Sequence, residues 1–249
     1  MPIHDWTRVS AGTWHAFHVA WISELQESLN DGRMPKDYYA LAEQITGPFG
    51  PDVLTLQNPN KDSDSNPGEQ GAGVALATAP PRVRVTAEGE FADYAAKRRT
   101  LVIRHSSGDR IVALLEVVSP GNKQGHLAFQ SFVEKAVATI QQRCSLFLVD
   151  LFPPTSRDPQ GLHAAIWSEF SVVPFQPPPD EPLTLASYSA GDVPRAYVEP
   201  TAVRRTLIDM PLFLTADYYV NVPLESTYQA AYKGFPQRWR DVLEGKRDH

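Results

Sequence analysis

The feature that most constrains this chain is the apolar run from Ile111 to Val118, which reads IVALLEVV. A continuous apolar run of this length is typical of a strand that is buried on both faces of a sheet. Glu116 is the one charged residue in it. An ionised carboxylate there costs several kcal/mol unless a metal ion or a cationic side chain compensates it. We therefore expect a positively charged partner beside Glu116.

The segment that follows predicts a strand, crossover helix, strand unit. His126 to Arg143 places apolar residues on one helical face, and the strand-like LFLVDLF of Leu146 to Phe152 comes next. Such crossovers are right-handed and lay their two strands parallel in one sheet. The sequence therefore predicts an α/β fold in which helices flank a mixed sheet.

Further elements are indicated on both sides of this unit. Apolar residues at helical spacing predict a helix over Ala11 to Asn30, with Ser10 as its cap. Tyr38 to Ile45 and Val53 to Gln57 read as one β-hairpin, and Arg99 to His105 with Arg110 to Val118 as a second.

We expect one domain over residues 1–249, with its core at about 36–152 and an exposed, flexible insertion at about 58–81. Residues 153–249 are interpreted as a proline-rich extension that decorates the core. It includes short strands at Leu183 to Ser187, Ala196 to Val198 and Leu212 to Thr215, and a helix from Leu224 to Leu243 that is kinked near Pro236.

Composition limits the location and the partners. The chain has one cysteine, no basic-then-apolar opening and no run of ~18 apolar residues, so we expect a cytoplasmic protein that is neither exported nor membrane-embedded. The net charge of −6 argues against binding nucleic acid by global charge, but a local basic groove for DNA or RNA stays open. A phosphate-facing stripe could form there, although such a run is more often a solvated edge; its residues would be Arg82, Arg84, Lys97, Arg98, Arg99 and Arg104.

Four features carry a resemblance to known families: the dipeptide Pro51-Asp52, Glu116 in the phrase EVVSPGNK, a downstream helix with Lys135, and the strand LFLVD. Their order resembles the PD-(D/E)XK restriction-endonuclease-like superfamily, and especially the Uma-type endonucleases. The opening MPIHDWTRVSAG and the stretch YYALAEQ also resemble a bacterial family of about this length that is built on a domain of unknown function. The nuclease-like resemblance covers about Tyr38 to Phe152.

The resemblance implies a divalent-metal-dependent nuclease that hydrolyses phosphodiester bonds. Asp52 and Glu116 would bind the cation, usually Mg²⁺, and a lysine would orient or activate the attacking water. The motif places that lysine where this chain has Val118, so Lys123 or Lys135 must replace it. We favour Lys135, because a packed helix fixes an amine better than a loop does. Glu43 is a further candidate ligand.

Other interpretations stay open. Glu116 and Lys135 could form a structural ion pair in a catalytically inactive, nuclease-like binding or scaffold protein. A salt bridge between them that closes the pocket, or a wide separation of Asp52 from Glu116, would favour that alternative. His4, Asp5, His15 and His18 could suggest a zinc site, although His18 lies on the apolar stripe of its helix and fits a core position.

Overall fold

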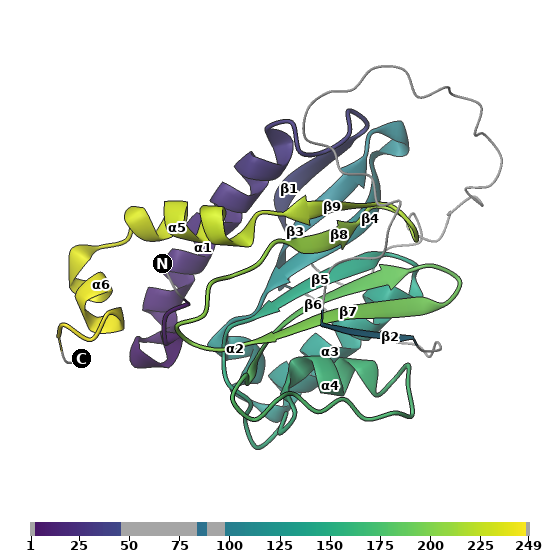
Figure 1. Ribbon diagram of the computed structural model, residues 1–249. Coiled ribbons are helices and arrows are strands. Elements are labelled where there is room, and N and C mark those ends of the chain that lie inside the picture. Colours follow the sequence, from purple (N-terminus) through teal and green to yellow (C-terminus); the bar gives the residue numbers. More distant parts are fainter. Residues whose placement is uncertain (1–2, 46–83, 89–97, 248–249) are drawn as a thin grey trace.

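The computed structural model describes residues 3–45, 84–88 and 98–247 of the chain. Within these residues, seven strands form a mixed sheet in the order β1-β3-β4-β5-β6-β7-β2, and two more form a separate ribbon (Figure 1). The β4–β5 pair is parallel, and the other neighbouring pairs are antiparallel. The strands are β1 (Tyr38–Ile45), β2 (Val85–Glu88), β3 (Arg98–His105), β4 (Arg110–Val117), β5 (Ser145–Asp150), β6 (Leu183–Ala190), β7 (Pro194–Thr201), β8 (Met210–Phe213) and β9 (Tyr219–Val222).

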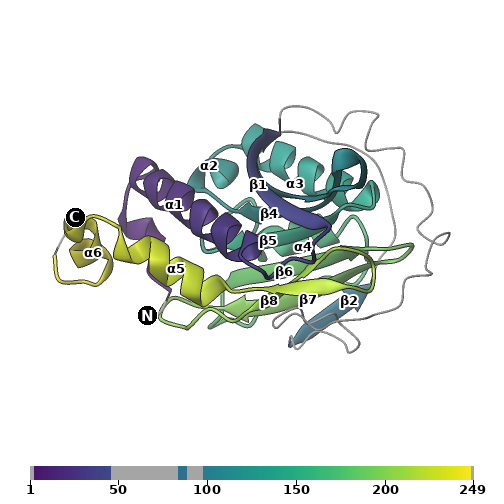
Figure 2. The ribbon, with the colours of Figure 1, turned by 90° about the horizontal axis from the view of Figure 1, so that it is seen from above.

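Helices cover both faces of this sheet. The pair α1 and α5 lies side by side on one face together with the β8–β9 ribbon, whereas α3 and α4 lie on the other (Figure 2). The helices are α1 (Ala11–Asn30), α2 (Pro120–Lys123), α3 (His126–Gln141), α4 (Gly161–Trp167), α5 (Leu224–Lys233) and α6 (Gln237–Leu243), with short 3-10 turns η1 (Trp6–Arg8) and η3 (Ser107–Asp109). The prediction of an α/β fold is confirmed.

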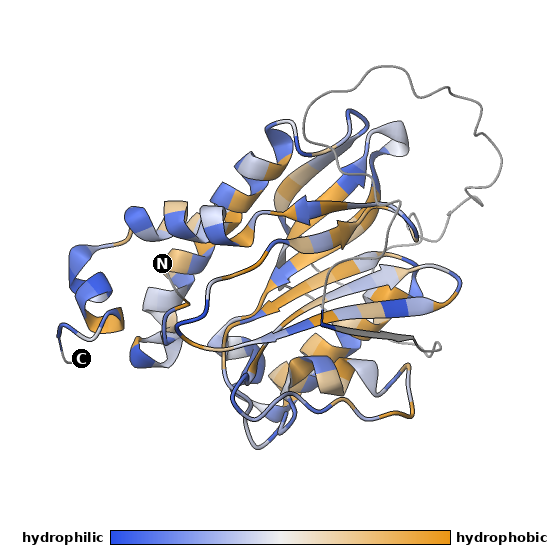
Figure 3. Cartoon of the chain, in the orientation of Figure 1, coloured by the Kyte–Doolittle hydropathy of each residue, from blue (hydrophilic) through white to orange (hydrophobic). Residues whose placement is uncertain are grey.

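The strand, helix, strand unit is confirmed as β4, α3 and β5. Alternate residues of the central strands supply two separate cores, because successive side chains in a strand point to opposite faces. Leu115 of β4 packs beneath α1, while its neighbour Leu114 packs beneath α3. β4 and β5 are mostly apolar, as Figure 3 shows, which matches their burial on both faces of the sheet.

Helix α1 begins and ends where the sequence predicts. The Ser10 side chain accepts a hydrogen bond from the Thr13 amide at 3.2 Å, which caps the helix. Large aromatic side chains fill the space between α1, α5 and the sheet, and they include Trp14, Phe17 and Trp21, each with no exposed surface. The N-terminal segment joins this core through Trp6.

The strand β1 lies at one edge of the sheet, and α1 covers its outer side. The Asn30 side chain makes two hydrogen bonds to the backbone of Ala40, at 2.8 and 2.9 Å. One helical turn earlier, the side-chain Oε1 of Gln26 accepts from the Ala42 backbone amide at 2.7 Å. Among the described residues the neighbour of β1 is β3. The Val53 to Gln57 segment, predicted to form a hairpin with Tyr38–Ile45, lies outside the described residues.

The C-terminal third is not decoration, which corrects our interpretation of it. The three short strands predicted there are confirmed as β6, β7 and β8, and the first two extend the main sheet beyond β5. The kinked helix is also confirmed, as α5 and α6 on either side of Pro236. The proline-dense stretch at 173–182 is only the connection from α4 to β6.

Candidate functional site around Glu116 and Lys135

Glu116 occupies the α3-facing side of β4. Its neighbours Leu115 and Val117 point into the core beneath α1, so the two-residue period of the strand turns Glu116 toward α3. The side chain is buried, with 5% of the residue exposed. A charged carboxylate at this depth requires a compensating cation.

Lys135 supplies that cation from α3. This lysine is also 5% exposed, and its Nζ donates a hydrogen bond to Oε1 of Glu116. It lies on the helix face that packs Phe132 and Ala136 against the sheet, so its aliphatic stem is buried among them and its amine reaches the strand. Lys135, preferred over Lys123 from the sequence, is thus the lysine beside Glu116, and the ion pair considered there as a structural alternative is formed.

Thr100 completes a buried three-residue cluster. It lies on β3, one position before the Leu101–Leu115 pair, and is 2% exposed. Lys135 Nζ donates to Thr100 Oγ1 at 2.6 Å, and the same hydroxyl donates to Oε1 of Glu116. Ammonium, hydroxyl and carboxylate therefore contact one another, which lowers the cost of burying the charges. Sequence reasoning missed Thr100, although it is the polar residue of β3 nearest Glu116 in the hairpin.

Lys123, the second candidate lysine, belongs to a different cluster. Its Nζ lies 2.7 Å from Oδ2 of Asp150 and 2.9 Å from Oδ2 of Asp158, and it donates to the Phe152 carbonyl oxygen at 3.1 Å. All three charged residues of this cluster are buried. Burial raises the pKa of Asp150 to about 6 despite the opposing effect of Lys123. Lys123 thus fastens α2 to the end of β5 instead of pairing with Glu116.

Glu43, the proposed further ligand, is held by an arginine. Its two carboxylate oxygens accept from Nε and Nη2 of Arg104 at 2.9 and 3.0 Å, the paired geometry that arginine favours with carboxylates. Glu43 is the register partner of Thr100 across the β1–β3 pair. The strand order therefore aligns it with the cluster, but its carboxylate is engaged elsewhere. Asp52 lies outside the described residues.

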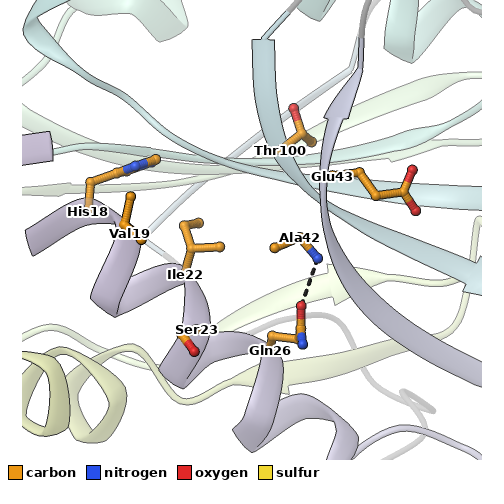
Figure 4. A pocket seen from close by; sticks show the side chains of 8 residues that line it. All are labelled: His18, Val19, Ile22, Ser23, Gln26, Ala42, Glu43 and Thr100. Carbon is orange, nitrogen blue, oxygen red and sulfur yellow. Dashed lines mark hydrogen bonds between the residues drawn. The ribbon is translucent and has the colours of Figure 1, made fainter. Parts of the chain in front are cut away.

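A cavity of about 350 Å³ lies on the α1 side of the sheet, opposite to the α3 side on which Glu116 and Lys135 meet. It lies between α1 and the β1–β3 edge, and Thr100 is the member of the buried cluster that lines it (Figure 4). The other lining residues are His18, Val19, Ile22, Ser23, Gln26, Ala42 and Glu43. Figure 4 shows the Glu43 carboxylate pointing away from α1, toward the side where Arg104 holds it.

The N-terminal histidines do not form a metal centre with the described residues. His4 is buried, with its Nδ1 2.8 Å from the Tyr228 hydroxyl, and burial lowers its pKa to about 4. His18 is buried on the core side of α1, as its place in the apolar stripe indicates. Among residues 3–45, 84–88 and 98–247, no three histidine, cysteine or acidic side chains group as metal ligands.

The expected basic stripe is largely neutralised where it is described. Arg84 pairs with Glu181 and Glu199, each at 2.8 Å, and Arg104 pairs with Glu43. Arg82 and Lys97 lie outside the described residues, and the side chains of Arg98 and Arg99 are not described. In the described part of this stripe, Arg84 and Arg104 are thus paired with carboxylates.

None of the described helices combines the length and apolar character needed to cross a membrane. Comparison of the chain with protein-family models, with curated proteins and with solved structures yields no match.

Proposed function

We propose that this chain is a divalent-metal-dependent nuclease of the PD-(D/E)XK type, with Glu116 as a metal ligand and Lys135 as the cation that acts on the attacking water. The observation that carries the proposal is the contact between Lys135 Nζ and Oε1 of Glu116. The resemblance requires a lysine near Glu116, and Val118 occupies the motif position on the strand. A lysine on α3 stands beside the carboxylate instead.

The three clustered side chains have distinct roles in this proposal. Lys135 brings an ammonium with three donors, which can orient a water and oppose the negative charge that develops on a phosphate. Glu116 fixes that ammonium and offers carboxylate oxygen to a cation. Thr100 holds both groups through its single hydroxyl. Burial strengthens each interaction, because little water is present to screen it.

Magnesium is the cation that this proposal implies. Mg²⁺ prefers oxygen ligands and keeps several waters, so one or two protein carboxylates suffice. Glu116 would hold the ion, with Asp52 as the second carboxylate that the sequence resemblance implies. Glu43 is a weaker candidate, because Arg104 already pairs with both of its oxygens. When bound, the ion lowers the pKa of a coordinated water and so supplies a nucleophile near neutral pH.

Calorimetric titration with Mg²⁺ and Mn²⁺ tests this proposal. The wild type should bind, while Glu116→Gln and Asp52→Asn should each lose binding. Asp217→Asn is a matched control, because it changes an exposed carboxylate between β8 and β9. Circular dichroism should establish that each variant is folded before binding is compared.

Metal-dependent cleavage of DNA and RNA is the second readout. Any hydrolysis by the wild type should disappear in Glu116→Gln and in Lys135→Met. Cleavage that persists in Glu116→Gln would refute the assignment of this site.

A specific observation favours a second candidate, an inactive nuclease-like scaffold or binding module. Glu116 and Lys135 are both buried and already neutralise each other, which is the arrangement expected of a structural ion pair. This candidate predicts no divalent-metal binding by the wild type and no cleavage of either nucleic acid.

A further inference from the structure

We propose that Lys123 and Asp150 form a covalent isopeptide bond, and that Asp158 accepts the proton that the lysine must lose. The three side chains meet where α2, the end of β5 and the loop before α4 come together. Lys123 Nζ lies 2.7 Å from Oδ2 of Asp150 and 2.9 Å from Oδ2 of Asp158. The bond is a modification that the chain makes in itself, and it does not depend on the proposed hydrolysis.

The three groups are shielded from water. Lys123 is 4% exposed, and Asp150 and Asp158 are each 2% exposed. Phe152, two residues after Asp150, is also buried, and Trp14 of α1 packs edge-on against it with ring centroids 5.0 Å apart. Burial holds the amine and the carboxyls in fixed positions and keeps bulk water from competing with the amine.

Asp150 has the features of the carboxyl that is attacked. Its Oδ1 accepts a hydrogen bond from the Phe152 amide at 3.1 Å, so a backbone donor is in place to stabilise negative charge that develops on this oxygen. Burial raises the pKa of Asp150 to about 6, which increases the fraction of neutral carboxyl near neutral pH. The neutral form is the better electrophile, because the charge of a carboxylate repels an attacking electron pair.

Asp158 is placed to take the proton from the ammonium. Its Oδ1 accepts from the Thr155 amide at 2.7 Å and from the Thr155 hydroxyl, which fixes the side chain with Oδ2 beside the amine of Lys123. A carboxylate at this distance can act as a general base. The Lys135 amine instead donates to the Thr100 hydroxyl, a much weaker base.

The bond forms by loss of one water. The Lys123 ammonium transfers one proton to Asp158, and the free amine attacks Cγ of the neutral Asp150 carboxyl. The nitrogen–carbon bond forms, the bond from Cγ to the hydroxyl breaks, and the departing hydroxyl takes a second proton from the nitrogen. The third proton stays on the amide nitrogen. The product is a neutral amide beside a protonated Asp158, so the cost of burying charges is removed.

The position of the bond gives it a structural role. It joins α2 to the end of β5, and the chain between its two ends contains α3. The crossover helix that carries Lys135 is thus enclosed in a covalent ring. Such a ring restricts the unfolded chain and stabilises the fold, as a crosslink that closes a long loop does.

Mass spectrometry of the intact, denatured full-length chain tests the proposal directly. We expect the wild type, held at neutral pH until its mass is constant, to be lighter than its sequence by one water molecule. After tryptic digestion, one branched peptide should contain both Lys123 and Asp150, because trypsin does not cleave after an acylated lysine. Dehydration of a single aspartate to a cyclic imide gives the same loss of mass but no branched peptide.

Three variants complete the test, each checked for folding by circular dichroism. Lys123→Arg keeps a cation beside both carboxylates but replaces the amine with a poorly nucleophilic guanidinium, so its mass should equal that of its sequence. Asp158→Asn keeps the shape of the side chain and removes the proton acceptor, so the bond should form ~100-fold or more slowly. Lys233→Arg, at an exposed position of α5, is the matched control and should lose one water as the wild type does.

The wild-type result is decisive even if a variant fails to fold. A wild-type mass that stays at the sequence value would overturn the proposal. A loss of water that persists in Lys123→Arg, or that yields no branched peptide, would also overturn it. An unchanged rate of bond formation in Asp158→Asn would overturn the assignment of Asp158 as the proton acceptor.

Discussion

Replacement of Lys135 by methionine should destabilise the fold strongly. Methionine fills a similar volume but leaves the Glu116 carboxylate buried with no cation, and removal of one partner from a buried ion pair costs roughly 3–5 kcal/mol. Thr100 would retain a hydrogen bond to the carboxylate and recover only part of that loss. We therefore expect the free energy of unfolding in urea, measured with a chelator present, to fall by about 3 kcal/mol.

A double-mutant cycle isolates the pair. Glu116→Leu combined with Lys135→Met removes both charges, so the double variant should recover most of the stability that Lys135→Met loses. Arg143→Met is a suitable control, because its partner Asp192 and the arginine are both largely solvent-exposed and such pairs contribute no more than ~1 kcal/mol. A loss below about 1 kcal/mol for Lys135→Met, or no coupling in the cycle, would refute the reasoning.

Three further perturbations test other parts of the structure. Lys123→Met should destabilise the protein at pH 7, and less so below pH 6, because the raised pKa of Asp150 lets that carboxyl take up a proton there; urea unfolding at pH 7 and pH 5 measures the difference. Burial lowers the pKa of His163 to about 3, so the unfolded chain binds the extra proton and stability should fall as pH drops below 6.5. In His163→Phe this acid sensitivity should shrink, by up to about 5 kcal/mol over the whole window, as acid-unfolding curves would show. Asn30→Ala removes both bonds to Ala40 and should speed hydrogen exchange of that amide, at a cost of about 1–2 kcal/mol in unfolding free energy.

The central unit could be predicted because its signals are local. A continuous apolar strand, an amphipathic helix and a second apolar strand leave few alternatives, and Glu116 is the one charged residue in the run Ile111 to Val118. Lys135 could be placed beside it because helical periodicity shows which residues of α3 face the sheet. Lys123 was harder to place, because its partners Asp150 and Asp158 come together only when the chain beyond β5 folds back.

The sequence does not show that Thr100 lies opposite Glu116, because a register shift separates Thr100 from the turn of the hairpin. The hairpin begins at the His105–Arg110 pair, and a bulge between Ile103 and Arg104 moves the later pairs by one residue. Without that shift Glu116 would face the neighbour of Thr100, and a slip of one residue turns the opposite side chain to the other face.

The composition of the C-terminal strands explains why the sequence does not place them in the main sheet. β6 reads LTLASYSA and is buried throughout, yet Thr184, Ser187 and Ser189 interrupt its apolar pattern. Two of these hydroxyls find partners far along the chain, since Ser187 donates to the Pro211 carbonyl and Ser189 donates to the Ala216 carbonyl at 2.7 Å. These acceptors come close only in the folded protein, so the sequence alone does not show that the polar residues of β6 can be buried.

The Asn30 and Gln26 side chains of α1 affect whether a second copy of the protein can add a strand to β1. An uncovered edge strand is a template on which another molecule can add a strand, and proteins commonly block such edges. Here Asn30 and Gln26 occupy backbone groups of Ala40 and Ala42 that an incoming strand would use. Growth of the sheet past β1 therefore requires three intramolecular hydrogen bonds to break first, which gives the folded chain a built-in resistance to aggregation through this edge.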